Sequence, residues 1–351
     1  MSTEPRSRLR AAAVVTLVGT GLLAPITAPT ATAAGARWDI SLAAEDIIID
    51  IVRHGDDQPP ADERVPFSPQ YPGAGISALG EQEAAHTASQ LYAELGDKIA
   101  GFFSGPDTDV QETAAAFGKL VDMHPQILNG LVEVDGGIFA NQPTTSIGGL
   151  YYDAATVLWM LGLVNALMIP DARDYNGVIV DDKYTADIDT MYHDAMGNPV
   201  VAPDGKITDV AYSSEAATMI WTILNVKNPD PIALIDTVIA SLKTGGELAL
   251  IPNAGVVQIE GNPTDGWTLL DWAGHKVPTN PGVLGDAFLI WRDLVFPEQA
   301  AFDHVLDAVA SGSSTELTEA FHDGFVSISA ALDDIPATVD NLFADIETGT
   351  W

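Results

Sequence analysis

The chain has 351 residues, of which 49 are Asp or Glu and 15 are Lys or Arg, so its formal net charge at pH 7 is −34. This charge argues against nucleic acid and anionic membrane surfaces as partners, because both are themselves negatively charged. Hydrophobic residues make up 47% of the chain, which is ample for a folded core. Cysteine is absent, so stability has to come from packing without disulfides.

The first 33 residues have the pattern of a cleavable signal peptide. Three arginines between positions 6 and 10 precede an apolar stretch at 11–26, and Ala-Thr-Ala at 31–33 forms a cleavage site. The mature chain is therefore predicted to begin at Ala34 and to be secreted or held in the cell envelope. A retained membrane anchor is the alternative, which the prolines and small residues before Ala34 disfavour. Cleavage would leave 12 Lys and Arg against 48 Asp and Glu, a net charge of −36.

The segment after residue 46 combines a buried strand with a reactive turn. Ile47–Val52 is an apolar, β-branched run in which Asp50 is the polar exception, and Arg53, His54 and Gly55 follow directly. Side chains that do chemistry in open α/β sheets gather at the carboxyl ends of strands. A nucleophilic imidazole beside a guanidinium, with a glycine that allows close approach, suits the capture of a phosphoryl group. The alternative is a histidine and an arginine on an ordinary exposed loop.

Further along the chain, apolar periodicity predicts alternating helices and strands. The first elements expected are a helix at about 81–95, a strand at 99–103, a helix at about 110–121 and a strand at 131–134 with Glu133 near its end. The apolar stretch 151–169 is expected to be a helix buried on most sides, and 171–206 an acidic, loop-rich segment. Later elements are a strand at 210–213, a helix through 218–224, and strands at 247–251, 256–259 and 267–272.

Strand–helix alternation of this kind predicts an α/β fold, a mostly parallel sheet sandwiched by helices. We expect one domain at 34–284, with a helical and loop insertion at about 140–206, followed by an acidic helical extension at 285–351. In that extension, Phe302, Val305, Leu306 and Val309 share one helix face. Gly312-Ser313-Ser314 separates a second amphipathic stretch containing Phe321, Phe325 and Leu332, and Pro336 is expected to interrupt it.

The order of these motifs resembles the histidine phosphatase superfamily, also called phosphoglycerate-mutase-like, and in particular exported members from mycobacteria and their relatives. The resemblance covers roughly residues 45–275 and rests on Arg53-His54-Gly55, Leu79-Gly80-Glu81-Gln82, Ser104, Gln111-Glu112-Thr113-Ala114, Glu133, Pro252–Val257 and Glu260–Trp267. It implies that His54 attacks phosphorus while cationic groups hold the phosphoryl oxygens, and that Glu133 protonates the leaving oxygen. Such chemistry needs no cofactor.

Two positions depart from the family pattern. The second pocket arginine of the family lies four residues before its Thr-Ala pair, and Asp109 stands there in this chain. The second histidine of the family follows a strand-ending serine, and the equivalent position here is Ser214, with Glu215 beside it. The presumed phosphate pocket therefore lacks two cations and gains carboxylates, which predicts an incomplete catalytic set.

Two classes of function remain open from the sequence. The first is a phosphomonoester hydrolase acting through a phosphohistidine at His54, with weak or altered activity. The second is a pseudophosphatase that binds a ligand or partner in the former catalytic cleft. If the apolar stretch 151–169 covers the site, the ligand is expected to be a phosphorylated and amphiphilic small molecule. No metal is expected, because Asp187, Asp189 and Asp194 lack the glycine and final glutamate of a calcium loop.

Overall fold

A computed structural model of the chain describes residues 45–58, 64–66, 73–229 and 250–350. The predicted signal peptide at 1–33 lies outside the described residues, as does most of the predicted strand at 247–251. The described part of that strand, Leu250 and Ile251, is a bend.

A seven-stranded mixed sheet carries the site, with the strand order β3-β2-β4-β1-β5-β6-β7. The strands β3, β2, β4 and β1 are parallel to one another, and β5, β6 and β7 continue the sheet as antiparallel strands. Their bounds are β1 (Ile47–Arg53), β2 (Gly101–Ser104), β3 (Gln126–Ile127), β4 (Thr208–Ser213), β5 (Val256–Asn262), β6 (Gly266–Trp272) and β7 (His275–Lys276).

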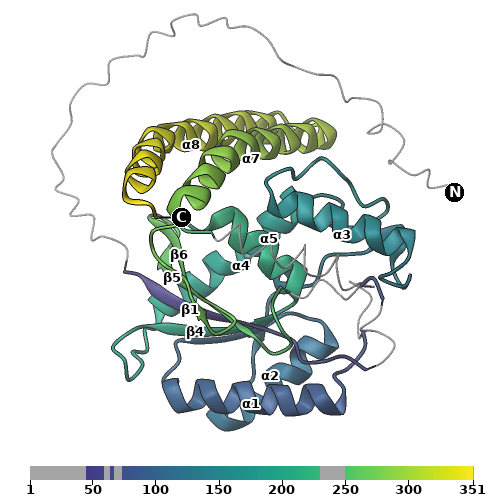
Figure 1. The fold of residues 1–351 in the computed structure, drawn as a ribbon. Coiled ribbons are helices and arrows are strands. Elements are labelled where there is room, and N and C mark those ends of the chain that lie inside the picture. The colour runs from purple at the N-terminus through teal and green to yellow at the C-terminus, as the bar shows by residue number, and fades with distance from the viewer. Residues whose placement is uncertain (1–44, 59–63, 67–72, 230–249, 351) are drawn as a thin grey trace, which may run out of the picture. The chain divides into compact units, whose positions relative to one another are not determined.

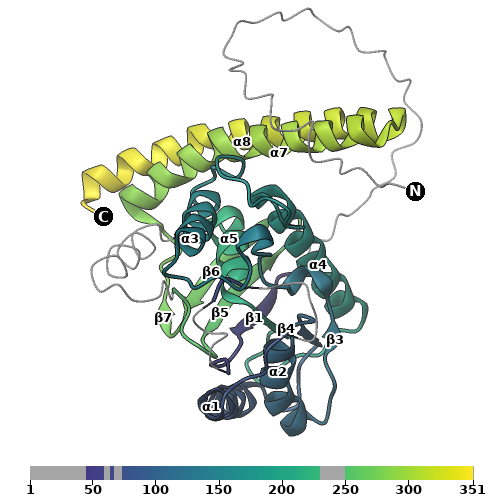
Figure 2. The ribbon, with the colours of Figure 1, turned by 90° about the vertical axis from the view of Figure 1, so that its right-hand side faces the viewer.

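Helices cover both faces of the sheet, as Figures 1 and 2 show. One face carries α1 (Ala78–Leu95) and α2 (Thr108–Val121), and the other carries α3 (Ile147–Met160), α4 (Gly177–Gly197) and α5 (Glu215–Asn225). Strand β1 is buried along its whole length because its side chains alternate between the two layers. Ile49 and Ile51 pack into the core under α3, α4 and α5, whereas Val52 packs into the core under α1 and α2.

The expected α/β sandwich with a parallel core is confirmed, but several local expectations are wrong. Residues 131–134 form no strand; a short 3₁₀ helix, η4 (Asn129–Leu131), ends at the first residue of this segment, and the rest is irregular. The apolar helix at 151–169 ends at Met160, and Gly162 at φ 81° carries the chain out of it. The segment 171–206 is not loop-rich, because α4 runs for 21 residues through it.

The C-terminal helices α7 (Gly282–Ser311) and α8 (Ser314–Thr348) form an antiparallel hairpin (Figure 2). The side chain of Arg292 donates to the carbonyl of Val226 at 2.8 Å, and Gln299 donates to that of Gly162 at 2.8 Å, so α7 is bound to the sheet domain. Pro336 was expected to interrupt the last helix, yet α8 continues through it. A proline inside a helix costs about 3 kcal/mol, which packing along a helix of this length can offset.

Among the described residues, no helix combines the length and the apolar character that crossing a bilayer would require.

Candidate functional site

The reactive turn after β1 is held by backbone hydrogen bonds to two neighbouring segments. Arg53 N–H donates to the carbonyl of Gly255 at 3.0 Å, and His54 N–H donates to that of Ser213 at 3.1 Å. Gly55 N–H donates to Thr113 Oγ1 at 2.9 Å. A Cβ at Gly55 would lie 2.7 Å from the carbonyl oxygen of Gly80, so this position requires glycine for the approach of α1.

His54 has the tautomer that a nucleophilic histidine needs. Its Nδ1 lies 2.9 Å from the carbonyl oxygen of Gly55. Because a carbonyl oxygen only accepts, Nδ1 carries a proton, and in the neutral ring the lone pair is on Nε2. The side chain is 10% exposed, at the carboxyl end of β1.

Two carboxylates lie close to the same imidazole. Nδ1 of His54 is 3.4 Å from Asp57 Oδ1 and 3.7 Å from Asp109 Oδ2. Burial alone would lower the pKa of His54, but the negative charges of Asp109 and Asp57 outweigh it and raise that pKa to about 10. At neutral pH the imidazole is therefore protonated, and the lone pair that would attack phosphorus is occupied.

Arg53 is tied into an ion pair instead of facing an open anion site. Its Nη1 lies 2.7 Å from Glu215 Oε2 and donates to the carbonyl of Ile251 at 2.6 Å. The other oxygen of Glu215 accepts from the backbone N–H groups of Leu250 and Ile251, at 2.5 and 3.0 Å. Glu215 thus neutralises the guanidinium and anchors the segment at 250–251. Both side chains are about nine-tenths buried, at 10% and 11% exposure.

Ser214 lies beside the reactive turn. In the parallel pairing of β1 with β4, Arg53 is opposite Ser213, so the next residues of the two strands, His54 and Ser214, lie on the same sheet edge. Ser214 is the N-cap residue of α5, its side chain caps no N–H, and it is 1% exposed.

Glu133 reaches the same region from a loop, since the strand expected there is absent. Its Oε2 accepts from Ala216 N–H at 3.3 Å at the start of α5, and its Oε1 accepts from Val134 N–H at 2.6 Å. Burial raises the pKa of Glu133, so this carboxyl retains a proton to higher pH than an exposed glutamate does. A carboxyl whose pKa is raised by burial is suited to act as a general acid.

The structure therefore brings Arg53, His54, Asp109, Glu133 and Ser214 to one edge of the sheet. Sequence reasoning missed Asp57 and Asp107. Asp57 follows His54 by three residues, and this short separation was the sequence signal that its carboxylate could lie near the imidazole. Burial raises the pKa of Asp107 to about 6, and its Oδ2 accepts from Glu133 N–H at 3.2 Å.

A divalent cation would find its donors at His54, Asp57 and Asp109, whose ligand atoms lie within 4.8 Å of one another. The Nδ1 proton of His54 points to the carbonyl of Gly55, which competes with such ligation. We therefore assign no metal to the site.

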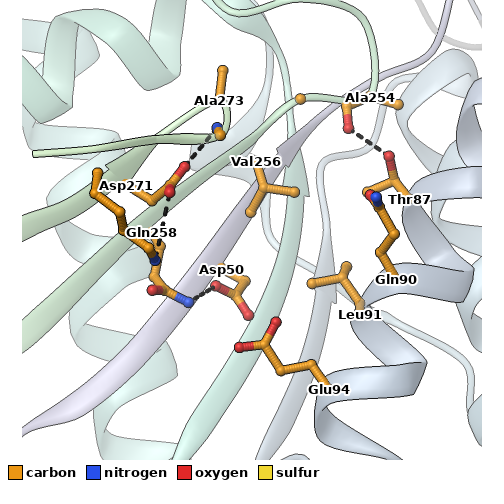
Figure 3. Close-up of a pocket in the computed structure, with 13 residues that line it drawn as sticks. Asp50, Thr87, Gln90, Leu91, Glu94, Ala254, Val256, Gln258, Asp271 and Ala273 are labelled. Atoms are coloured by element: carbon orange, nitrogen blue, oxygen red, sulfur yellow. Dashed lines mark hydrogen bonds and ion pairs between the residues drawn. The ribbon is translucent and has the colours of Figure 1, made fainter.

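A separate pocket of about 440 Å³ lies on the α1 side of the sheet (Figure 3). Asp50 of β1 and Glu94 of α1 face each other across it, and Gln258 donates to Asp50 Oδ1 at 2.8 Å. Burial raises the pKa of Asp50 to about 7. None of the residues proposed from the sequence for the site lines this pocket.

Comparison with known proteins adds a relative and several structures. No protein-family model matches the chain. It is 36% identical over 298 residues to the PE-PGRS family protein PE_PGRS11 of Mycobacterium tuberculosis; the match covers 84% of the chain but about half, 48%, of that relative.

Solved structures that align with the chain include a mycobacterial glucosyl-3-phosphoglycerate phosphatase (16% identity, TM-score 0.47, 65% of this chain and 99% of that one). Another is the phosphoglycerate mutase of Bacillus anthracis str. Sterne (15% identity, TM-score 0.42, 66% and 94%). Identities this low do not reveal which side chains are shared, so the chemistry has to be taken from the chain's own residues.

Proposed function

We propose that the chain is an exported protein of the histidine phosphatase type that hydrolyses phosphomonoesters slowly through a phosphohistidine at His54. The observation that carries this proposal is the hydrogen bond from Nδ1 of His54 to the carbonyl of Gly55, which assigns the nucleophilic lone pair of the neutral ring to Nε2.

The reaction would take place in two steps. Nε2 of His54 attacks phosphorus, and the bond from phosphorus to the leaving oxygen breaks while the Glu133 carboxyl gives that oxygen its proton. A water molecule then attacks the phosphohistidine and returns a proton to Glu133. The bond between phosphorus and nitrogen breaks, which releases inorganic phosphate and restores His54.

Three features of the site slow this reaction. Arg53 is neutralised by Glu215, His54 is protonated at neutral pH, and Asp109 places a negative charge near the phosphoryl group. Loss of a single preorganised donor typically costs about 10²–10³ in rate. The repulsion of a phosphate dianion by a carboxylate a few ångströms away is on the order of several kcal/mol at an effective dielectric constant near 20.

Hydrolysis of an aryl phosphate by wild type, His54→Ala and His86→Ala tests the proposal. His86 is exposed on α1, so its variant controls for the loss of an imidazole elsewhere. We expect slow turnover by wild type and His86→Ala and none by His54→Ala. Brisk His54-dependent turnover at pH 7 would show that another group supplies the missing charge.

A pseudophosphatase that binds a ligand or partner in the same cleft is the second candidate. The ion pair between Arg53 and Glu215 favours it, because the guanidinium is already engaged. Turnover by wild type that equals that of His54→Ala at every pH would support this candidate over the hydrolase.

The substrate class that we propose is a phosphorylated, amphiphilic small molecule. Its apolar part would contact the insertion, where Ile147 and Leu150 at the start of α3 are exposed. Faster hydrolysis of a long-chain alkyl phosphate than of a short-chain one would support this assignment, and the reverse order would refute it.

Export is proposed on the signal-peptide pattern of residues 1–33. N-terminal sequencing of the native protein should give Ala34 as the first residue, in the envelope or the medium. A first residue of Met1 or Ser2 would refute cleavage.

A further inference from the structure

The hairpin of α7 and α8 exposes large apolar side chains, one of which, Trp291, also contacts the sheet domain through a hydrogen bond from its Nε1 to the carbonyl of Leu161 at 2.9 Å. On α7, Trp291, Phe302 and Val309 are exposed, and on α8 the same holds for Phe325 and Phe343. Phe302 and Phe325 are 54% and 74% exposed, values that leave most of each ring in water. Contiguous exposed apolar surface of this kind marks interaction sites.

The apolar side chains form one stripe along each helix. Successive residues of a helix are rotated by about 100°, so residues spaced by four, seven or eleven fall on one face, within about 40° of one another. Trp291, Phe302 and Val309 follow this spacing on α7, as Phe325, Leu332 and Phe343 do on α8. Each helix thus carries its own exposed stripe.

The two stripes lie on the same side of the hairpin. The helices approach closely at Ala301 and Gly324, since a Cβ at Gly324 would lie 2.7 Å from the Cβ of Ala301. Phe302 follows Ala301, and Phe325 follows Gly324, so each ring stands about a quarter turn from the contact line. Viewed along the hairpin axis, the chain turns clockwise in one helix and anticlockwise in the other, because the two helices are antiparallel. A quarter turn from the contact line therefore brings both rings to the same side of the hairpin.

The register brings the stripes level with each other. Asn280 donates to Asp345 at 3.0 Å, which sets the same antiparallel alignment as the contact between Ala301 and Gly324. Phe302 then lies within about 3 Å of Phe325 along the hairpin axis, the rise of two residues. The two stripes combine into one surface, which we call the hairpin face.

Few charges lie within the hairpin face. On α8, Glu347 follows Phe343 by four residues and therefore falls within the stripe, whereas Asp333 and Asp340 lie toward the outer edge. On α7, Glu298 is the acidic residue whose helical position falls within the stripe, and Arg292 lies on the side that contacts the sheet domain. A basic partner would find only Glu298 and Glu347 within the stripes, and an anionic lipid surface would meet the strongly negative chain.

We propose that the hairpin face binds a second copy of this chain, so that the two hairpins form a four-helix bundle. The 30 residues of α7 span about 45 Å, and two adjacent helices are about 20 Å wide, so the face offers about 900 Å² per protomer. A stable interface needs roughly 800 Å² per partner. Face-to-face pairing buries the apolar stripes and leaves the acidic residues outside the stripes in water, where salt screens them.

Sedimentation of the purified full chain over a range of concentrations tests the proposal. The wild type should have twice the mass of one chain. Phe325→Glu and, on the other helix, Phe302→Glu should each weaken dimerisation on the order of 100-fold, because both would bury an unpaired charge at the centre of the interface. Val326→Glu is the matched control, since Val326 is 51% exposed on the outer edge of the same helix.

Circular dichroism of each variant shows whether it retains its helices, and only folded variants are compared. A wild type that remains a monomer at about 100 µM would overturn the proposal, because dimerisation would then be too weak for a specific interface. Equal dissociation by Val326→Glu, or a dimer that survives both phenylalanine changes, would also overturn it, because the contact would then lie elsewhere.

Discussion

Asp57 reaches the imidazole of His54 from the loop after β1, and Asp109 reaches it from the first turn of α2. In a site that binds phosphate, the groups around the histidine would be expected to carry positive charge. Here Asp57 and Asp109 carry negative charge and stabilise the protonated imidazole, so the intended nucleophile forms ion pairs with two carboxylates. The substitution that matters most is thus at Asp109, whose charge acts on His54 and on any phosphate alike.

We expect the rate of hydrolysis by wild type to increase with pH up to about 10, because the pKa of His54 is raised to about 10 and only the neutral ring attacks phosphorus. Asp109→Asn removes the largest factor that raises this pKa. Its rate should begin to rise at lower pH, and at pH 7.5 it should exceed the wild-type rate by tenfold or more. Rate–pH profiles of aryl phosphate hydrolysis measure both effects.

Asp122→Asn is the control for this prediction, because Asp122 is exposed at the C-terminal end of the same helix in the left-handed conformation that asparagine tolerates. Its profile should match that of the wild type. An Asp109→Asn profile that also matches wild type would show that Asp109 does not set the charge of His54.

Much of the site follows from sequence, because it depends on strand ends. Arg53, His54 and Ser214 lie together since β1 and β4 are neighbouring parallel strands, and the apolar runs before these residues predict both strands. The pairing of Arg53 with Glu215 is different: it depends on the direction of two side chains, one at the end of β1 and the other at the start of α5. No periodicity encodes that direction, so the sequence predicted a free guanidinium.

At the scale of elements, α4 is the clearest difference between expectation and structure. Its sequence contains several acidic residues and has little apolar periodicity, which suggested a loop. One side of the helix is nevertheless buried, with Val180, Tyr184 and Ile188 in the core. Tertiary packing therefore decides this segment, and local propensity alone cannot reveal it.

The helix has a start signal in Asn176. Its Oδ1 accepts from Ile179 N–H at 3.1 Å and its Nδ2 donates to Asn165 Oδ1 at 2.6 Å, in a fully buried position. Asn176→Ala removes both bonds and should lower the free energy of unfolding by about 2–3 kcal/mol. Urea unfolding followed by circular dichroism measures this loss.

The same change at Asn198, the exposed residue that ends α4, provides the comparison. Asn198→Ala should change stability by less than about 0.5 kcal/mol. If the two variants were equally stable, the cap would contribute nothing and another interaction would have to fix the start of α4.

On the scale of the whole molecule, the excess of acidic residues extends into the interior. Burial raises the pKa of Asp50 and of Asp181 to about 7, and that of Asp209 to about 8. The layered fold was predictable from apolar patterning, but these buried carboxyls were not. In the sequence, Asp50 interrupts an apolar strand. Asp209 directly precedes the predicted strand at 210–213, and no apolar pattern marks it as buried.

These shifts determine the sign of the pH dependence of stability. A buried carboxyl with a raised pKa keeps its proton in the folded state after the unfolded chain has lost it, so stability falls as pH rises from about 4 to about 8. His54 acts in the same direction: its stabilising effect is complete below pH 6.5 and is lost as pH rises through about 10. The free energy of unfolding should thus be greatest at about pH 4 and should decrease at each higher pH up to about 10.

Thermal unfolding between pH 5 and pH 9 should show a decrease in Tm of at least 10 °C, which for a protein of this size corresponds to several kcal/mol. Asp209→Asn removes one buried ionisation and should flatten the decrease, with a gain in stability at pH 8. Asp97→Asn, at an exposed turn, should leave the slope unchanged. A Tm that rises from pH 5 to pH 9 would contradict this prediction. It would mean that the buried carboxyls ionise in the folded protein at no cost in stability.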